Sequence, residues 1–319
     1  MKKQVNYSIA IVVLSFIAVK HLRKVGLDYY EHIQVNLEQL TGFYDFTSPD
    51  KISLLPFELR EISGLTDYSN NEIACIHDEA GIIFIYDLNK DSISKQFHFE
   101  KLGDFEGLTK VGSTFYALRS DATLFEILPP YDSTSVKKMK LNLSSWDHEG
   151  LCFDERENRM LIAPKSKMGK GPEYKDIRSI YAIDLATLSM DENPIISINV
   201  SQLENFAKTK HLPLPMRLNK QKGDSVSALK FMPSSISVHP ITDELYIISA
   251  VDKTMAVYTK SGELKNYIML NPKMFNKPEG ITFLPDGTMI ITNEGEMGQP
   301  TLLRFSWNKT PSNSKVLKN

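Results

Sequence analysis

From residue 51 onward, apolar residues come in short runs that turn residues separate, which is the pattern of a β-protein. In the first stretch, Ile, Val, Leu, Phe and Tyr dominate residues 72–77, 82–88 and 93–99. The same arrangement recurs along the chain, with later strands expected at 107–111, 114–119, 123–127, 137–143, 150–153, 159–164, 179–185, 195–200, 235–239, 244–250, 254–259, 264–270, 280–284, 288–292 and 301–307. The pattern predicts an all-β domain.

A short signature opens the first strand of each group. It reads Ser63-Gly64-Leu65, Glu106-Gly107-Leu108, Glu149-Gly150-Leu151 and Glu279-Gly280-Ile281, with a degenerate copy at Ser235-Ile236-Ser237. The interval is 43 residues between the first three copies and 44 between the last two. A period of about 40–50 residues with strand-like content is typical of a β-propeller. We therefore expect five blades of four strands.

The last group lacks a fourth strand, because the tail at 308–319 is polar. Residues 51–56 are apolar and precede the first group, so we expect them to form the outer strand of the last blade. This pairing closes the ring and leaves no free sheet edge. The propeller domain is predicted to span residues 51–307.

The interval from Glu149 to Ser235 is twice the period, so it could hold a sixth blade. Residues 202–226 lack alternation and are rich in Lys, Arg and Pro, and we interpret them as a long loop with a short helix at 202–209. A second insertion covers residues 166–175. Loops of this length are often functional or mobile.

The N-terminal region differs from the rest. An apolar run at 7–19 lies between Lys2 and Lys3 on one side and Lys20, Arg23 and Lys24 on the other. Residues 1–24 therefore resemble a signal-anchor or a signal peptide, although the run is shorter than the ~20 residues of a typical spanning helix. We favour an uncleaved anchor over a cleaved signal or a buried helix. Residues 25–50 are predicted to be a spacer, and the domain is expected on the periplasmic or extracellular side of the cell membrane.

The composition of the chain bears on the kind of molecule that it could bind. The 319 residues carry a formal net charge of −2, which gives no reason to expect nucleic acid as a partner. Cys75 and Cys152 fall in apolar runs of different repeats, so we expect two buried thiols.

Three glutamates occupy one repeat position, at Glu106, Glu149 and Glu279. A ring geometry brings equivalent positions to one axis, where carboxylates repel one another unless they are protonated or bridged by a cation. Calcium suits such oxygen ligands, and Asn293 and Asp121 could add two more. The open alternative is that each glutamate caps turn amides or pairs with a Lys or Arg. Arg119 and Lys165 lie near the same mouth and favour a small anionic ligand there.

Catalytic motifs are sparse. His148, beside Glu149, could act as a general base, although a solvent-facing turn histidine is the other interpretation. The seven histidines show no zinc spacing, and no Gly-x-Ser-x-Gly elbow is present.

The motifs Asp104-Phe105-Glu106-Gly107-Leu108, Asp147-His148-Glu149-Gly150-Leu151 and Lys277-Pro278-Glu279-Gly280-Ile281 resemble the repeats of the SdiA-regulated family of YjiK-like and CarP-like propellers. Glu61-Ile62-Ser63-Gly64-Leu65 fits the family's opening signature, and the similarity covers about residues 52–307. The resemblance implies a five-bladed propeller on an exported or tethered protein that binds calcium. It also implies distant kinship with NHL-repeat propellers.

The leading hypothesis is a membrane-tethered, extracytoplasmic, calcium-binding propeller that acts as a binding or sensing module for a small anionic ligand or a protein. The alternative is a calcium-dependent hydrolase of an ester, lactone or phosphoester at the propeller mouth.

Overall fold

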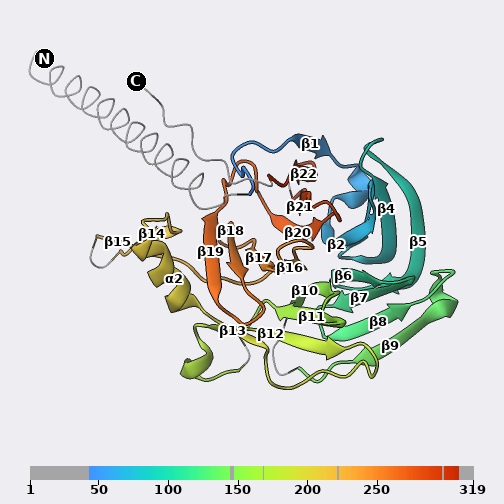
Figure 1. The fold of residues 1–319 in the computed structure, drawn as a ribbon, viewed down its shortest axis with the longest axis horizontal. Coiled ribbons are helices and arrows are strands. Elements are labelled where there is room, and N and C mark those ends of the chain that lie inside the picture. The colour runs from blue at the N-terminus through green and yellow to red at the C-terminus, as the bar shows by residue number, and fades with distance from the viewer. Residues whose placement is uncertain (1–42, 144–146, 168, 221–222, 297, 309–319) are drawn as a thin grey trace, which may run out of the picture.

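Five four-stranded antiparallel sheets surround a central axis in the computed structural model (Figure 1). The structure describes residues 43–143, 147–167, 169–220, 223–296 and 298–308. Four of these sheets are built from four strands in sequence order, so each of these repeats folds into one blade, and the fifth sheet combines strands from the two ends of the chain. The predicted five-bladed propeller of four-stranded blades is confirmed.

The blades follow the predicted groups closely. Blade 1 comprises β2 (Ile62–Ser69), β3 (Glu72–His77), β4 (Ala80–Asp87) and β5 (Ser92–Leu102). Blade 2 comprises β6 (Phe105–Val111), β7 (Thr114–Arg119), β8 (Thr123–Ile127) and β9 (Val136–Lys140). Blade 3 comprises β10 (His148–Asp154), β11 (Arg159–Pro164), β12 (Ile177–Asp184) and β13 (Ile196–Asn199). Blade 4 comprises β16 (Ser235–Val238), β17 (Leu245–Ser249), β18 (Thr254–Tyr258) and β19 (Leu264–Met269).

Blade 5 closes the ring as the sequence predicts. Its strands β20 (Pro278–Phe283), β21 (Met289–Asn293) and β22 (Thr301–Phe305) come from the end of the chain. The outer strand is β1 (Lys51–Leu54), which pairs antiparallel with β22 from Lys51 opposite Arg304 to Leu54 opposite Thr301. First and last strands thus share one sheet, and the ring has no free seam.

The signature apolar residue of each inner strand packs toward the preceding blade. Leu108 joins Ala74 and Ile76 of blade 1 in one cluster, and Ile281 joins Ile248 of blade 4 in another. Because every blade boundary carries such a cluster, the core is a ring of interfaces between sheets.

The long interval after blade 3 holds no sixth blade among its described residues. It contains α2 (Val200–Thr209) and a hairpin of β14 (Met216–Leu218) and β15 (Ser225–Ser227). Asn199 caps α2, since its side-chain oxygen accepts hydrogen bonds from the Ser201 and Gln202 amides. The helix was expected nearly in place, but the hairpin was not.

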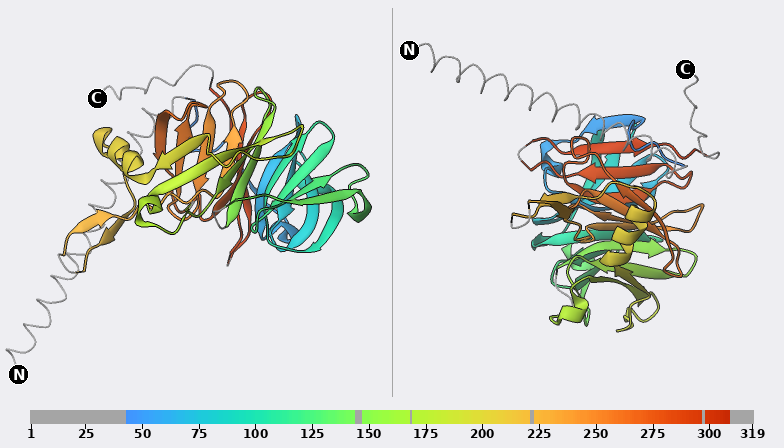
Figure 2. Two further views of the ribbon diagram at one scale, coloured as in Figure 1. Left: turned by 90° about the horizontal axis from the view of Figure 1, so that it is seen from below. Right: turned by 90° about the vertical axis from the view of Figure 1, so that its left-hand side faces the viewer.

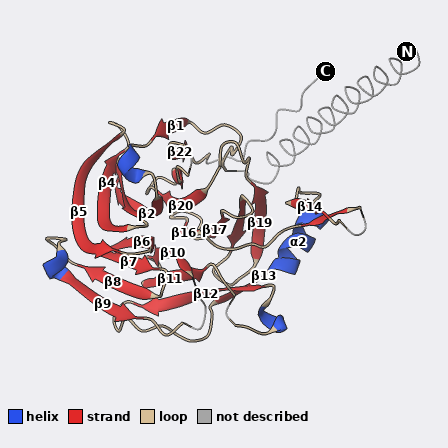
Figure 3. Ribbon diagram, turned by 180° about the vertical axis from the view of Figure 1, so that it is seen from behind, coloured by secondary structure: helices blue, strands red, loops and turns tan. Residues whose placement is uncertain are grey.

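Helical segments lie at the periphery of the ring (Figure 3). Besides α2, they are the single turns η1 (Phe57–Leu59), η2 (Ser133–Ser135) and η3 (Pro172–Tyr174). The strands therefore surround the central axis, and the helical segments lie at the outer edge of the ring.

Part of the predicted spacer packs on the propeller. Tyr44 and Phe46 are buried in the cluster between blades 4 and 5, and the Tyr44 hydroxyl donates to the Gly287 carbonyl at 2.6 Å. The predicted anchor at residues 1–24 lies outside the described residues. Within the described part of the chain, no helix has the length and apolar character needed to cross a membrane.

Candidate functional site

Each of the three repeat glutamates sits at a β-bulge in its innermost strand. The register between the first and second strand shifts from Phe105 to Gly107, from His148 to Gly150 and from Pro278 to Gly280. The residue skipped by each shift is the glutamate. A bulge adds one residue to a strand and re-aims its side chain. The same local device therefore orients all three carboxylates.

The glycine of the repeat signature lets neighbouring inner strands approach. A β-carbon at Gly64 would lie 2.7 Å from the Glu106 carbonyl, and one at Gly107 would lie 2.8 Å from the Glu149 carbonyl. Backbone cannot move away as a flexible side chain can, so these positions require glycine. The signature thus couples close packing at the axis to placement of an acid.

The structure brings the three carboxylates into electrostatic contact. Glu149 and Glu279 are buried, and Glu106 is half-buried. Burial raises the pKa of each carboxyl, and repulsion between the carboxylates raises it further. Glu149 raises the pKa of Glu106, Glu279 raises the pKa of Glu149, and Glu106 raises the pKa of Glu279. The pKa of Glu279 rises to about 7. The three carboxyls are therefore within electrostatic reach of one another.

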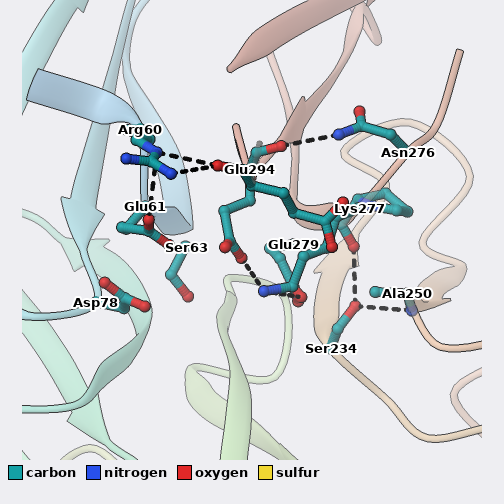
Figure 4. A network of polar contacts seen from close by, with 12 residues as sticks. Arg60, Glu61, Ser63, Asp78, Ser234, Ala250, Asn276, Lys277, Glu279 and Glu294 are labelled. Atoms are coloured by element: carbon teal, nitrogen blue, oxygen red, sulfur yellow. Dashed lines mark hydrogen bonds and ion pairs between the residues drawn. The ribbon is translucent and has the colours of Figure 1, made fainter. Parts of the chain in front are cut away.

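Two lysines partly neutralise this acidic centre. Lys165, at the turn after β11, places its Nζ 2.5 Å from Glu149 Oε1. Lys277 lies between two carboxylates, 3.8 Å from Glu279 Oε1 and in direct contact with Glu294 (Figure 4). We expected Lys165 to favour an anionic ligand, but its ammonium already pairs with Glu149. The alternative interpretation, in which a repeat glutamate pairs with a lysine, therefore holds for Glu149 and Glu279.

Serines fill the two remaining positions around the axis. The Ser63 hydroxyl donates to Glu106 Oε2 at 3.0 Å and to the Glu106 carbonyl at 2.9 Å. In blade 4 the sequence alignment is wrong by one residue. Ser235 Oγ accepts the Ile281 amide at 3.1 Å, close to the place where Gly64 meets Leu108 of the next blade, so Ser235 stands at the glycine position. Ser234 takes the glutamate position, and its hydroxyl donates to the Pro278 carbonyl.

An outer acidic group borders the centre on the side of blades 1 and 5. Glu294 follows β21, and its carboxyl has a raised pKa because it is buried and lies beside the Glu61 carboxyl. Asp78, after β3, also has a raised pKa through burial, and its Oδ1 is buried without a hydrogen-bond partner among the described residues. Arg60 donates from Nε to the Glu296 carbonyl at 3.1 Å. The sequence did not predict the role of Lys277.

The two further oxygen ligands that the sequence suggested lie in different settings. Asn293 is buried at the end of β21, where its Nδ2 donates to the Met274 carbonyl and to Thr301 Oγ1. Asp121 lies on the turn after β7 and pairs with Arg119 at 2.9 Å and Lys140 at 3.2 Å. These cations hold the pKa of Asp121 well below its usual range. Asp121 is therefore already neutralised at the surface.

His148 is buried rather than solvent-facing. Its Nδ1 lies 2.7 Å from the Ser120 carbonyl, and burial lowers its pKa. The side chain is thus held by the backbone of blade 2.

The opposite end of the axis is a polar pocket of about 480 Å³. All five inner strands contribute to its wall. Three residues after each glutamate position stands a small hydroxyl or thiol group that lines this pocket, and the five are Thr66, Thr109, Cys152, Ser237 and Thr282. Each repeat therefore contributes one residue to each of two rings around the axis. One ring is largely acidic, and the other consists of small polar groups.

The donor chemistry of the acidic centre suits a hard cation, because its carboxylate and hydroxyl groups offer oxygen ligands and the two lysines balance the three carboxylates incompletely. Glu279 Oε2 is buried and has no hydrogen-bond partner among the described residues. In the same part of the chain, no three Asp, Glu, His or Cys side chains are arranged closely enough to hold a metal ion. A cation would therefore require the carboxylates to move toward one another.

Comparisons with known proteins return propellers of low similarity. The sequence matches no family model and no curated protein. Among solved structures, the chain is similar to Myxococcus xanthus glutaminyl cyclase, with 12% identity, a TM-score of 0.49, and coverage of 82% of this chain and 96% of that one. It is also similar to a luciferin-regenerating enzyme, with 10% identity, a TM-score of 0.46, and coverage of 83% and 97%. A virginiamycin B lyase from Staphylococcus aureus gives 13% identity, a TM-score of 0.43, and coverage of 80% and 69%.

Proposed function

We propose that this chain is a membrane-tethered, extracytoplasmic β-propeller that binds a calcium ion at Glu106, Glu149 and Glu279. In this proposal the ion completes a rigid binding or sensing module. The observation that carries the proposal is that three carboxylates from one repeat position, each on a β-bulge, raise one another's pKa values.

The energetics favour a cation at this place. Burying an ionised carboxylate is costly unless it is paired and hydrogen-bonded. Lys165 balances Glu149, while Glu279 keeps one buried oxygen without a partner among the described residues. A calcium ion would supply the missing positive charge, and it accepts carboxylate and hydroxyl oxygens in loose geometry. The Ser63 hydroxyl already donates to Glu106 Oε2, and its oxygen could also bind the calcium ion.

The tether rests on the sequence. The apolar run at 7–19 with basic flanks favours an anchor, and the resemblance to the SdiA-regulated family supports export. The described chain enters the propeller through Tyr44 and Phe46, which are packed between blades 4 and 5. A rigid attachment here would hold the propeller in a fixed orientation to whatever precedes it.

The hydrolase alternative gains less from the described contacts. A general base must reach the proton that it abstracts. His148, the candidate base, is buried with Nδ1 against the Ser120 carbonyl. We therefore place the binding role first and keep hydrolysis as the second candidate.

Calorimetric titration of the full chain with calcium tests the binding role, with magnesium as the comparison ion. We expect one calcium ion per chain and weaker magnesium binding, because magnesium demands near-ideal octahedral geometry. Absence of calcium binding to the wild-type protein would contradict the proposal. Fractionation of cells that express a C-terminally tagged chain tests the tether, and a tag found wholly in the cytosol would contradict it.

A further inference from the structure

The β14–β15 hairpin stands outside the ring of blades (Figures 1 and 2). Its ladder pairs Met216 with Ser227, Arg217 with Val226 and Leu218 with Ser225, and neither strand joins a blade. The hairpin is thus an insertion that the propeller does not need for closure. Ordering such a projection costs chain entropy. Segments that project from a rigid scaffold often carry binding residues.

One face of the hairpin carries two apolar side chains that are open to solvent, opposite Ser225 and Ser227 of β15. Met216 and Leu218 alternate along β14, so their side chains point to the same side. They are 52% and 63% exposed. Single exposed apolar side chains are ordinary, but two on one face of a projecting hairpin indicate a surface that meets another phase or molecule.

Several exposed basic residues lie close to this apolar pair in the sequence. Lys210, Arg217 and Lys220 are exposed, and none of them forms an ion pair with a described residue. Lys208 differs, since its Nζ lies 2.5 Å from Glu204. Between residues 205 and 230 the sequence contains six Lys or Arg residues and one acid, Asp224, whereas the whole chain is nearly balanced. The segment that contains the hairpin is therefore locally basic in a weakly acidic protein.

We propose that the β14–β15 hairpin docks on an anionic lipid bilayer. Met216 and Leu218 would enter the interfacial layer, and Arg217, Lys220 and Lys210 would lie among the anionic headgroups. Each basic residue near such a surface strengthens partitioning by about fivefold. The proposed N-terminal tether would keep the hairpin close to a bilayer, so the inference rests on that part of the proposed function for its setting.

A dye at residue 216 of the full chain tests this docking. The native Cys75 and Cys152 are buried, so Met216→Cys provides one accessible thiol for an environment-sensitive fluorophore. Asn70→Cys, on the exposed turn between β2 and β3 of blade 1, is the matched control. We expect the emission at 216 to shift to the blue with vesicles of phosphatidylcholine plus phosphatidylglycerol, and not with phosphatidylcholine alone. The control dye should not shift.

Charge removal sharpens the test. Arg217→Gln with Lys220→Gln in the labelled chain should weaken the lipid response by roughly 25-fold, and added salt should weaken it in the unmodified hairpin. Equal shifts with neutral and anionic vesicles would overturn the proposal. So would a shift that appears without lipid as the protein concentration rises, because that result assigns the face to a second copy of the chain. Flotation on neutral vesicles reports the N-terminal tether separately, so failure of the tether and failure of the hairpin give different results.

Discussion

Lys165 Nζ lies 2.5 Å from Glu149 Oε1 at the centre of the propeller, and Glu149 is almost fully buried. The pair joins the innermost strand of blade 3 to the turn after its second strand. Lys165 thus places a positive charge directly beside the buried Glu149 carboxylate. The contact explains how the metal-free fold tolerates an acid there.

Replacement of Lys165 by Met should destabilise the metal-free protein. Removing one partner of a buried ion pair typically costs about 3–5 kcal/mol. Lys165 is a quarter exposed and Glu149 can take up a proton, so we expect about 1–3 kcal/mol at about pH 8 and less at about pH 6. Urea unfolding in chelator at both pH values measures the difference.

Lys138→Met is the matched control. Lys138 pairs with Glu100 on the surface, where such pairs are worth at most about 1 kcal/mol. If Lys165→Met costs no more than Lys138→Met at the higher pH, the Lys165 pair does not compensate a buried charge.

The pH dependence of stability should reveal the acidic centre. Burial and neighbouring carboxylates raise the pKa values of Glu106, Glu149 and Glu279, so the folded chain holds protons that the unfolded chain releases. Their contribution to stability is complete below about pH 4.5 and is lost as the pH rises through the folded-state pKa values of about 7 for Glu279 and about 8 for Glu106 and Glu149. The melting temperature in chelator should therefore fall across this interval.

Glu279→Gln separates this effect from other titrations. The variant should melt less steeply with rising pH, because one raised pKa is gone. At about pH 8 it should be more stable than the wild type by roughly 1–3 kcal/mol, or several degrees in melting temperature. Parallel pH profiles for the two proteins would show that Glu279 does not carry a raised pKa.

Ring closure through β1 predicts a strong effect of Ser53→Pro. Ser53 pairs with Leu302 of β22, and proline cannot donate a ladder hydrogen bond. We expect a loss of about 1–3 kcal/mol from the unpaired ladder group, in addition to the loss of the Ser53 hydroxyl contact. Ser53→Ala retains the ladder and removes only the 2.7 Å hydrogen bond to Asp91 Oδ1, so it should cost about 1 kcal/mol. Equal losses in denaturant unfolding would mean that the strand pairing contributes little.

Much of this architecture could be predicted because a propeller repeats one local pattern. The period of the Glu-Gly-Leu signature fixed the blade count, and the missing strand after Trp307 placed residues 51–56 in the last blade. Blade 4 misled the alignment because Ser234 and Ser235 both resemble the serine that opens blade 1. The contact of Ser235 with the Ile281 amide identifies the correct register.

The site was harder to predict than the fold. Repeat position alone brought Glu106, Glu149 and Glu279 together, since a closed ring converges on its axis. The partners of these acids depend on side-chain reach, which spacing does not encode. Lys277 and Lys165 could equally have faced solvent, and Asp121 could have faced the axis instead of Arg119 and Lys140. The β14–β15 hairpin escaped notice because its strands are only three residues long.

Calcium-dependent unfolding of wild type and Glu149→Gln tests the central claim most directly. An ion that binds only the folded state stabilises it by about 2.7 kcal/mol at a hundredfold excess over Kd. Wild type and Glu263→Gln, a change at an exposed side chain, should both show this rise in melting temperature. Glu149→Gln should lose most of it. If Glu149→Gln retains the full calcium shift of the wild type, the three carboxylates are not the calcium site.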